Sequence, residues 1–345
     1  MSCTPSSIPG SVLPELATPS GPGPGPGLGA AAPLVVSSRR RAHWISAPVI
    51  VGMVVLTFWV VVALTVQWWA PYDPLEVAGP RLEGPSSQNW IGTDDLGRDV
   101  FTRTMYGARN SLPIAVLVIL ASVVIGSLVG SIAGFMGKWA DSILMRLVDV
   151  TLAFPPILLA MIIAATLGPG LRNAFFAMIV VWWPIYARLL RGQVMAVKEL
   201  DHVEAAVAIG ASRPRILRRH ILPLSMTPIL VNATVDFGNV VLLFASLSFI
   251  GLGATPPDPE WGSMITEGAK QFYDWHIATA PGLAIFTVVL ASNFVGDGLR
   301  DLFDPRGTSG LQIAQILLGR DDEHHPHQRK QDARTEVTGH DEHRR

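Results

Sequence analysis

Six apolar stretches of this chain contain no Asp, Glu, Lys or Arg, and they constrain the fold more than any other feature. They lie at 42–72, 110–137, 150–171, 173–187, 237–257 and 275–296. About 20 helical residues cross a bilayer core, so most of these stretches are long enough to span it. The composition agrees, because 15% of the residues are charged, against about 25% in ordinary soluble domains. We therefore expect an all-α, polytopic membrane protein with six transmembrane helices.

Two of the six predicted spans need a further argument. The stretch 173–187 rises only about 22 Å as a helix, but the side chains of Arg172 and Arg188 can extend to the two membrane surfaces. The fifth span is expected to begin earlier than its charge-free stretch, near Thr227, and to contain Asp236.

The basic residues predict the orientation of the chain. With the N-terminus inside, 20 of the 26 Lys and Arg residues lie on the cytoplasmic side, as the positive-inside rule requires. Both termini are then cytoplasmic. The predicted parts are a disordered, Pro/Gly-rich cytoplasmic head, a first transmembrane helix, an extracytoplasmic loop, a five-helix core with a cytoplasmic loop at 192–224, and a cytoplasmic tail. Their ranges are 1–41, 42–69, 70–110, 111–306 and 307–345.

Enzyme and metal motifs are missing from the sequence. It contains no GxxxxGK[ST], HExxH or GxSxG. Cys3 is the only cysteine, so neither an intramolecular disulfide nor a cysteine metal cluster can form. The tail histidines 324, 325 and 327 are typical of a solvated segment, and a net charge of −1 gives no basic surface for nucleic acid. We expect no catalytic residue, no metal and no cofactor.

Polar groups inside predicted spans are candidates for a functional role, because they are costly in lipid. Asp149, Asn232 and Asp236 are the candidates for the pathway. Asp149 lies three residues after Arg146, which favours a local ion pair, and Asn232 lies four residues before Asp236, which favours a hydrogen bond facing the bundle interior. A proton relay through such groups is the alternative. Prolines within Phe154-Pro155-Pro156 and at Pro184 are expected to kink their helices.

A cytoplasmic helix–turn–helix is predicted at 204–223, which reads EAAVAIGASRPRILRRHILP. Good helix formers precede Gly210, which supplies a left-handed stop. Ser212 is placed to cap a second helix with Pro214 in its first turn, and Pro223 is expected to end that helix. The plain interpretation is a basic loop lying on lipid headgroups.

This stretch resembles the EAA loop of ATP-binding-cassette importer permeases, with Glu-Ala-Ala, a glycine and a closing Leu-Pro. His220 stands where the general pattern has Ile, which resembles the dipeptide/oligopeptide/nickel branch. Four further segments of this chain resemble the same branch. They lie at 89–112, 182–193, 247–262 and 281–306 (NWIGTDDLGRDVFTRTMYGARNSL, WWPIYARLLRGQ, LSFIGLGATPPDPEWG and PGLAIFTVVLASNFVGDGLRDLFDPR). The residues expected to couple to an ATPase are Glu204, Ala205, Ala206, Gly210, Ala211, Arg218, His220, Leu222 and Pro223.

The resemblance implies a type I importer permease fold in the cell membrane and a non-catalytic translocation subunit. Its implied partners are a second permease subunit, two cytosolic ATP-binding subunits, an extracytoplasmic substrate-binding protein and membrane lipid. The implied substrates are di- and oligopeptides. Two alternatives remain, namely import of nickel or another small solute by the same machinery, and a proton-coupled secondary transporter.

Overall fold

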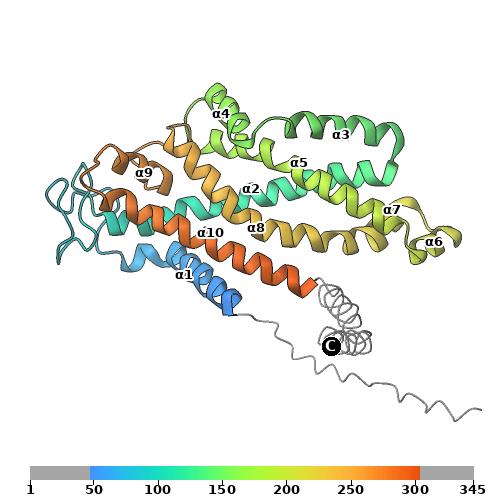
Figure 1. Cartoon of the computed structure of the whole chain (residues 1–345), viewed down its shortest axis with the longest axis horizontal. Helices are drawn as coiled ribbons and strands as arrows, with labels where there is room; N and C mark the ends of the chain where they lie inside the picture. Colours follow the sequence, from blue (N-terminus) through green and yellow to red (C-terminus); the bar gives the residue numbers. More distant parts are fainter. Residues whose placement is uncertain (1–46, 304–345) are drawn as a thin grey trace, which may run out of the picture. The chain divides into compact units, whose positions relative to one another are not determined.

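The computed structural model describes residues 47–303, so the predicted head 1–41 and tail 307–345 lie outside the described residues. Within this part every regular element is helical, apart from an isolated bridge between Thr93 and Asp99. A π-helical turn, Leu217–Ile221, joins α7 to α8. The helices (Figure 1) are α1 (Ala47–Trp69), α2 (Val100–Met136), α3 (Lys138–Leu152), α4 (Pro156–Leu167), α5 (Leu171–Lys198), α6 (Asp201–Ala208), α7 (Arg213–Ile216), α8 (Leu222–Phe249), α9 (Trp261–Ala269) and α10 (His276–Phe303). The all-α prediction is confirmed here.

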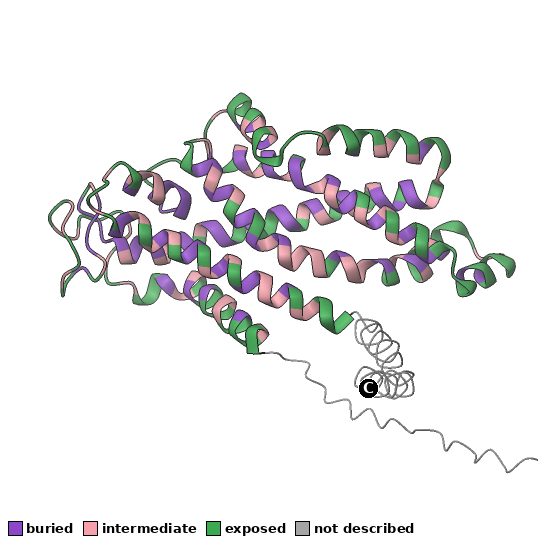
Figure 2. Ribbon diagram, viewed as in Figure 1, coloured by how far each residue is buried: buried purple, intermediate pink, exposed green. Residues whose placement is uncertain are grey.

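Five helices are long and apolar enough to cross a membrane. They are α1, α2, α5, α10 and the continuous helix Arg213–Phe249, which contains α7 and α8. Many of the buried residues, purple in Figure 2, belong to α2, α5, α8 and α10, which pack against one another. The outward faces carry exposed aliphatic side chains such as Leu64, Leu117 and Leu128. Apolar exposure on this scale fits a lipid surrounding rather than water.

The kink predicted at Phe154-Pro155-Pro156 in the third span, 150–171, is confirmed as a break between two helices. α3 and α4 meet at an angle of 90°. Pro155 and Pro156 cause the break, because proline has no N–H to donate and disfavours helical geometry in the residue before it. α4 has 12 residues and rises about 18 Å, too little to cross a hydrocarbon core of about 30 Å. The described residues thus contain five candidate spans, or six if the bent pair counts as one.

The predicted loop 70–110 ends earlier than expected, because α2 begins at Val100. Asp99 occupies the N-cap position, where its carboxylate accepts a hydrogen bond from the Thr102 amide at 2.7 Å. Such a cap satisfies one of the free N–H groups of the first helical turn. The interior prolines Pro113 of α2 and Pro184 of α5 leave both helices continuous.

A buried ion-pair network fastens the loop 70–99 to α2 and α9. Arg98 lies 2.7 Å from Asp94 and 3.2 Å from Glu267. Arg103 of α2 lies 3.3 Å from Asp94 and 3.2 Å from Glu267. Burial raises the pKa of the Glu267 carboxyl, and the charges of Arg103 and Arg98 oppose that rise. The buried guanidinium groups of Arg98 and Arg103 are therefore each paired with carboxylates, as buried ions must be.

Three carboxylates of this network, those of Asp94, Asp95 and Glu267, lie close enough together to hold a cation. Arg98 contacts all three of them, the Asp95 carboxylate more loosely at 3.9 Å. The guanidinium groups already supply the positive charge that a cation would bring. We interpret the cluster as a structural ion-pair network.

α2 approaches α5 through a stripe of glycines. Gly126, Gly130 and Gly134 recur every four residues, so they share one helix face. A Cβ atom at Gly130 would clash with the carbonyl oxygen of Ala187, and one at Gly126 would lie 2.5 Å from the carbonyl oxygen of Trp183. Small residues at this spacing let two membrane helices pack backbone to backbone. The sequence interpretation missed this motif, although the GxxxGxxxG spacing is visible at 126–134.

We expect Gly130→Ala to lower the stability of the purified protein in mild detergent by about 1–3 kcal/mol, the usual cost of overpacking. Gly282→Ala on α10 is the matched control, because a Cβ atom there meets nothing within 4 Å. The control should be neutral or stabilising by up to about 1 kcal/mol. Thermal unfolding of both variants checks this. Equal midpoints for the two variants would show that α2 and α5 do not pack at the glycine stripe.

The predicted orientation is testable by thiol labelling, because Cys3 is the only native cysteine. In a Cys3→Ser background, Ser87→Cys should react with a membrane-impermeant reagent on intact cells. Ser212→Cys should react only after the membrane is permeabilised. Both serines are exposed, so access depends on the side of the membrane. The opposite labelling pattern would invert the topology.

Candidate functional site

The predicted coupling loop connects α5 to α8 at one end of the helical unit, at the right of Figure 1. We call residues 199–221 the α5–α8 loop; it contains α6, a turn, α7 and the π-helical turn. α6 begins after Leu200 and carries Asp201 and Glu204 in its first turn. Acidic side chains there are favoured by the positive end of the helix dipole.

Gly210 ends α6 in the left-handed conformation, with φ +76°. The Gly210 amide donates to the Val207 carbonyl at 2.9 Å, and the Ala211 amide donates to the Ala206 carbonyl at 3.1 Å. This pair of bonds is the Schellman arrangement, which satisfies carbonyl groups at a helix C-terminus. The predicted glycine stop is confirmed. A Cβ atom at Gly210 would meet nothing within 4 Å, so its positive φ, and no contact in the described chain, requires glycine.

Two details of the second helix differ from the prediction. Ser212 stands at the N-cap position, but its side chain makes no capping bond, and its carbonyl accepts from the Arg215 and Ile216 amides. Pro223 does not end the helix, which continues to Phe249. The π-helical turn explains this, because the Leu222 amide reaches back five residues to the Leu217 carbonyl. That extra residue shifts the carbonyl that the Pro223 ring would otherwise strike.

The loop is packed onto the rest of the chain by one of its faces. Val203 and Ala206 of α6 and Ile216 and Ile221 of the following helix are buried and belong to the hydrophobic core. Ala206, one of the predicted coupling residues, is buried because α6 turns its side chain inward. Among the other predicted coupling residues, Ala211, His220 and Leu222 are half-buried. The exposed ones are Glu204, Ala205, Gly210, Arg218 and Pro223.

The outer face of the loop ends in exposed apolar side chains that the sequence interpretation missed. Ile209 is 85% exposed, and Ala205, four residues before it on the same side of α6, is also exposed. We call Ala205 and Ile209 the apolar tip. The signal was present in the sequence, because these residues lie beside the chain-reversing Gly210, where no second helix can cover them.

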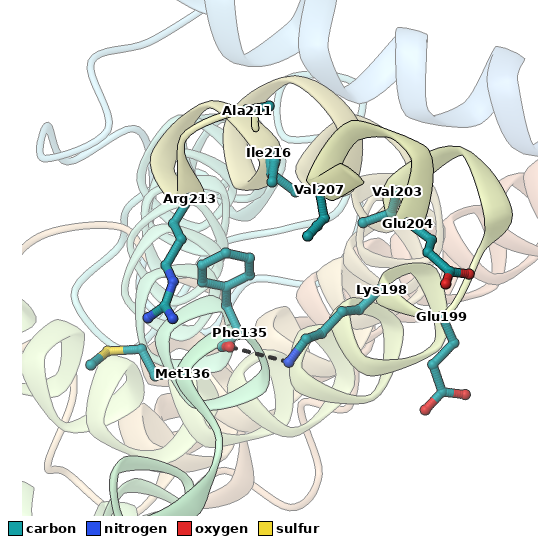
Figure 3. Close-up of a pocket in the computed structure, with 10 residues that line it drawn as sticks. All are labelled: Phe135, Met136, Lys198, Glu199, Val203, Glu204, Val207, Ala211, Arg213 and Ile216. Atoms are coloured by element: carbon teal, nitrogen blue, oxygen red, sulfur yellow. Dashed lines mark hydrogen bonds between the residues drawn. The ribbon is translucent and has the colours of Figure 1, made fainter. Parts of the chain in front are cut away.

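A groove of about 930 Å³ lies between the loop and the ends of α2 and α5. Apolar side chains of both the loop and α2 line it, together with charged ones (Figure 3); the residues are Phe135, Met136, Lys198, Glu199, Val203, Glu204, Val207, Ala211, Arg213 and Ile216. Lys198 donates to the Phe135 carbonyl at 3.4 Å and lies 5.9 Å from the Phe135 ring centre. Within residues 47–303 the Glu204 carboxylate forms no side-chain hydrogen bond or ion pair.

The intramembrane candidates fall into two separate contacts. Asp149 pairs with Arg188 of α5 at 2.6 Å, so the predicted pair with Arg146 is wrong: α5 runs beside α3 and offers the nearer cation. Both partners are more than half exposed. Asn232 donates to Asp236 at 2.8 Å, which confirms the predicted hydrogen bond.

Asp236 has a second partner that the sequence interpretation missed. The Tyr186 hydroxyl donates to its carboxylate at 2.9 Å, and both side chains are buried. Tyr186 lies 50 residues away in the chain. No local spacing rule could have paired them.

Comparison with known proteins gives the family. Residues 126–308 match the family described as binding-protein-dependent transport system inner membrane component. The dipeptide transport system permease protein of Alkalihalophilus pseudofirmus is 44% identical over 265 residues, covering 74% of this chain and 85% of that protein. The glutathione transport system permease protein of Pectobacterium atrosepticum is 44% identical over 258 residues, covering 74% of this chain and 85% of that protein.

A third relative is the probable D,D-dipeptide transport system permease protein of Escherichia coli. It is 39% identical over 259 residues, covering 74% of this chain and 87% of that protein. The resemblance found in the sequence is thus confirmed. Together with the helices of spanning length, these relatives make the chain a multi-pass inner membrane protein. The family match covers more than half of the residues. The chain belongs to the binding-protein-dependent transport system inner membrane components.

Proposed function

We propose that this chain forms part of the translocation pathway of an ATP-driven importer of di- and oligopeptides. In this proposal a second permease subunit completes the pathway, and an extracytoplasmic binding protein delivers the substrate. Two cytosolic ATP-binding subunits hydrolyse ATP, and this chain is a non-catalytic subunit. The α5–α8 loop is the site through which their motion enters the membrane.

The apolar tip is the observation that carries the coupling assignment. Ile209 and Ala205 stand exposed at the end of a loop whose other face is buried. Exposed apolar side chains at a defined tip are typical of a protein contact, whereas a loop lying on headgroups would present its arginines there. Arg213, Arg215, Arg218 and Arg219 all follow the turn, on the second helix. The tip is therefore suited to enter an apolar recess of a partner.

The names of the relatives support a peptide substrate. They are described as permeases for dipeptides, D,D-dipeptides and glutathione, all of which contain amide-linked amino acids. This favours peptides over nickel or another small solute. The family match likewise favours an ATP-driven importer over a proton-coupled transporter.

The substrate class is tested by uptake in a strain lacking this chain. Radiolabelled di- and tripeptides should enter wild-type cells and fail to enter the deletion strain, and the chain supplied in trans should restore uptake. Radiolabelled nickel serves as the comparison. Nickel uptake that depends on the chain, with peptide uptake unchanged, would contradict the peptide assignment.

The apolar tip is tested by Ile209→Asp, which places a charge where we expect an apolar recess in the ATP-binding subunit. Co-purification of that subunit in mild detergent should fall by about tenfold or more, as for a central interface residue. Membrane insertion should be unchanged, because Ile209 touches little of its own chain. Uptake should fall in parallel.

Ser212→Asp is the matched control for this variant. It adds the same charge three residues away on an exposed side chain, at an N-cap position that favours Asp. The control should retain the ATP-binding subunit. Full retention by Ile209→Asp as well would show that the tip does not dock, and would leave the loop as a lipid-contacting segment.

A further inference from the structure

A buried polar contact joins the two helices that carry the α5–α8 loop. Tyr186 of α5 is fully buried and Asp236 of α8 is 8% exposed. The Tyr186 hydroxyl donates to the Asp236 carboxylate at 2.9 Å, and Asn232 donates to the same oxygen at 2.8 Å. α5 leads into the loop and α8 leads out of it, so the contact closes a hairpin whose tip is the loop.

The contact lies deep in both arms of the hairpin and at a similar depth in each. Tyr186 precedes the end of α5 by 12 residues, and Asp236 follows the start of α8 by 14 residues. At 1.5 Å per residue these separations are about 18 Å and about 21 Å. The bond therefore lies in the region where apolar side chains alone would suffice to pack two spans.

A carboxylate in this region needs a physical reason, because placing one inside a membrane is costly. Apolar contacts between two helices allow small slides and rotations, since they have no preferred direction. A hydrogen bond requires a narrow range of distance and angle, so it fixes the two helices in one register. The contact between Tyr186 and Asp236 thus serves to fix the relative position of α5 and α8.

The loop itself is also tied to both arms. Val203 and Ala206 of α6, and Ile216 and Ile221 after the turn, are buried in the core that the arms share. A displacement of the tip then moves the base of the loop with it. A second contact, farther from the loop, is needed to keep α5 and α8 from sliding past each other.

We propose that Tyr186 and Asp236 are positioning residues that make α5 and α8 move as one body when the loop is displaced. The inference rests on the proposed function, in which ATP-binding subunits move the loop. Without the hydroxyl, α5 and α8 could slide past each other, and motion at the loop would be lost before it reached the pathway. ATP hydrolysis would then continue with less transport.

The test uses the complete complex in proteoliposomes, with binding protein outside and ATP at the ATP-binding subunits. The measured quantity is the uptake of radiolabelled di- and tripeptides per ATP hydrolysed. Tyr186→Phe removes only the hydroxyl, and this ratio should fall by about tenfold, within the range seen for residues that carry coupling between sites. Asp236→Asn keeps an oxygen that accepts the Tyr186 bond, so the ratio should stay within about twofold of the wild type.

Thr287→Val is the matched control. It removes the hydrogen bond between Trp59 of α1 and Thr287 of α10, 3.0 Å long, which joins two spans that do not carry the loop. Its ratio should also stay within about twofold of the wild type. Equal amounts of each variant in the membrane, measured by immunoblot, exclude a folding defect as the cause.

Three results would overturn the proposal. A wild-type ratio in Tyr186→Phe shows that the arms need no such bond. A loss in Asp236→Asn as large as in Tyr186→Phe shows that the carboxylate is needed for its charge or its proton. Equal losses in Tyr186→Phe and Thr287→Val show a general packing effect. Failure of the wild-type complex to import any peptide is distinct from these, because it removes the proposed function itself.

Discussion

The close packing of α5 against α2 is the contact on which the arrangement of the other helices depends. At Gly126 and Gly130 the α5 backbone lies against the α2 backbone, so α5 cannot turn or slide against α2 without a clash. Its remaining faces are then available for directional contacts. Arg191 forms a two-point ion pair with Asp141 of α3, with one bond of 2.6 Å, and Tyr186 bonds to Asp236 of α8. One helix is thereby held on three sides, and it is the helix that enters the α5–α8 loop.

The two ends of the helical unit use charge in opposite ways. At the end with the loop 70–99, Arg98 and Arg103 are buried with their carboxylate partners, where losing one partner would leave an unpaired buried charge. At the other end, the arginines after Gly210 are exposed, and each exposed contact they make is worth at most about 1 kcal/mol. The first end is therefore held by buried ion pairs, while the second presents its charged groups to water, lipid or a protein partner.

Local rules predicted several features of the chain that depend on neighbouring residues. The left-handed stop at Gly210 and the bond between Asn232 and Asp236 both follow from spacing along one helix, and both are confirmed. Two local rules failed, because Ser212 makes no side-chain capping bond and Pro223 does not end its helix. The other failures involve distant geometry. The pairing of Asp149 with Arg188 depends on which helices lie side by side. The inward turn of Ala206 depends on how α6 docks on the core.

The α5–α8 loop has two apolar faces, and the chain itself needs only one of them. Val203 and Ala206 are three residues apart and face the core. Ala205 and Ile209 are four apart and share the opposite face, because residues at these spacings lie on one side of a helix. A loop that served only to connect two spans would gain nothing from a second apolar face in contact with water, and polar residues there would be more soluble. The second face therefore favours a partner that covers it, and the rigid attachment of the first face is what would let such a partner move the helices.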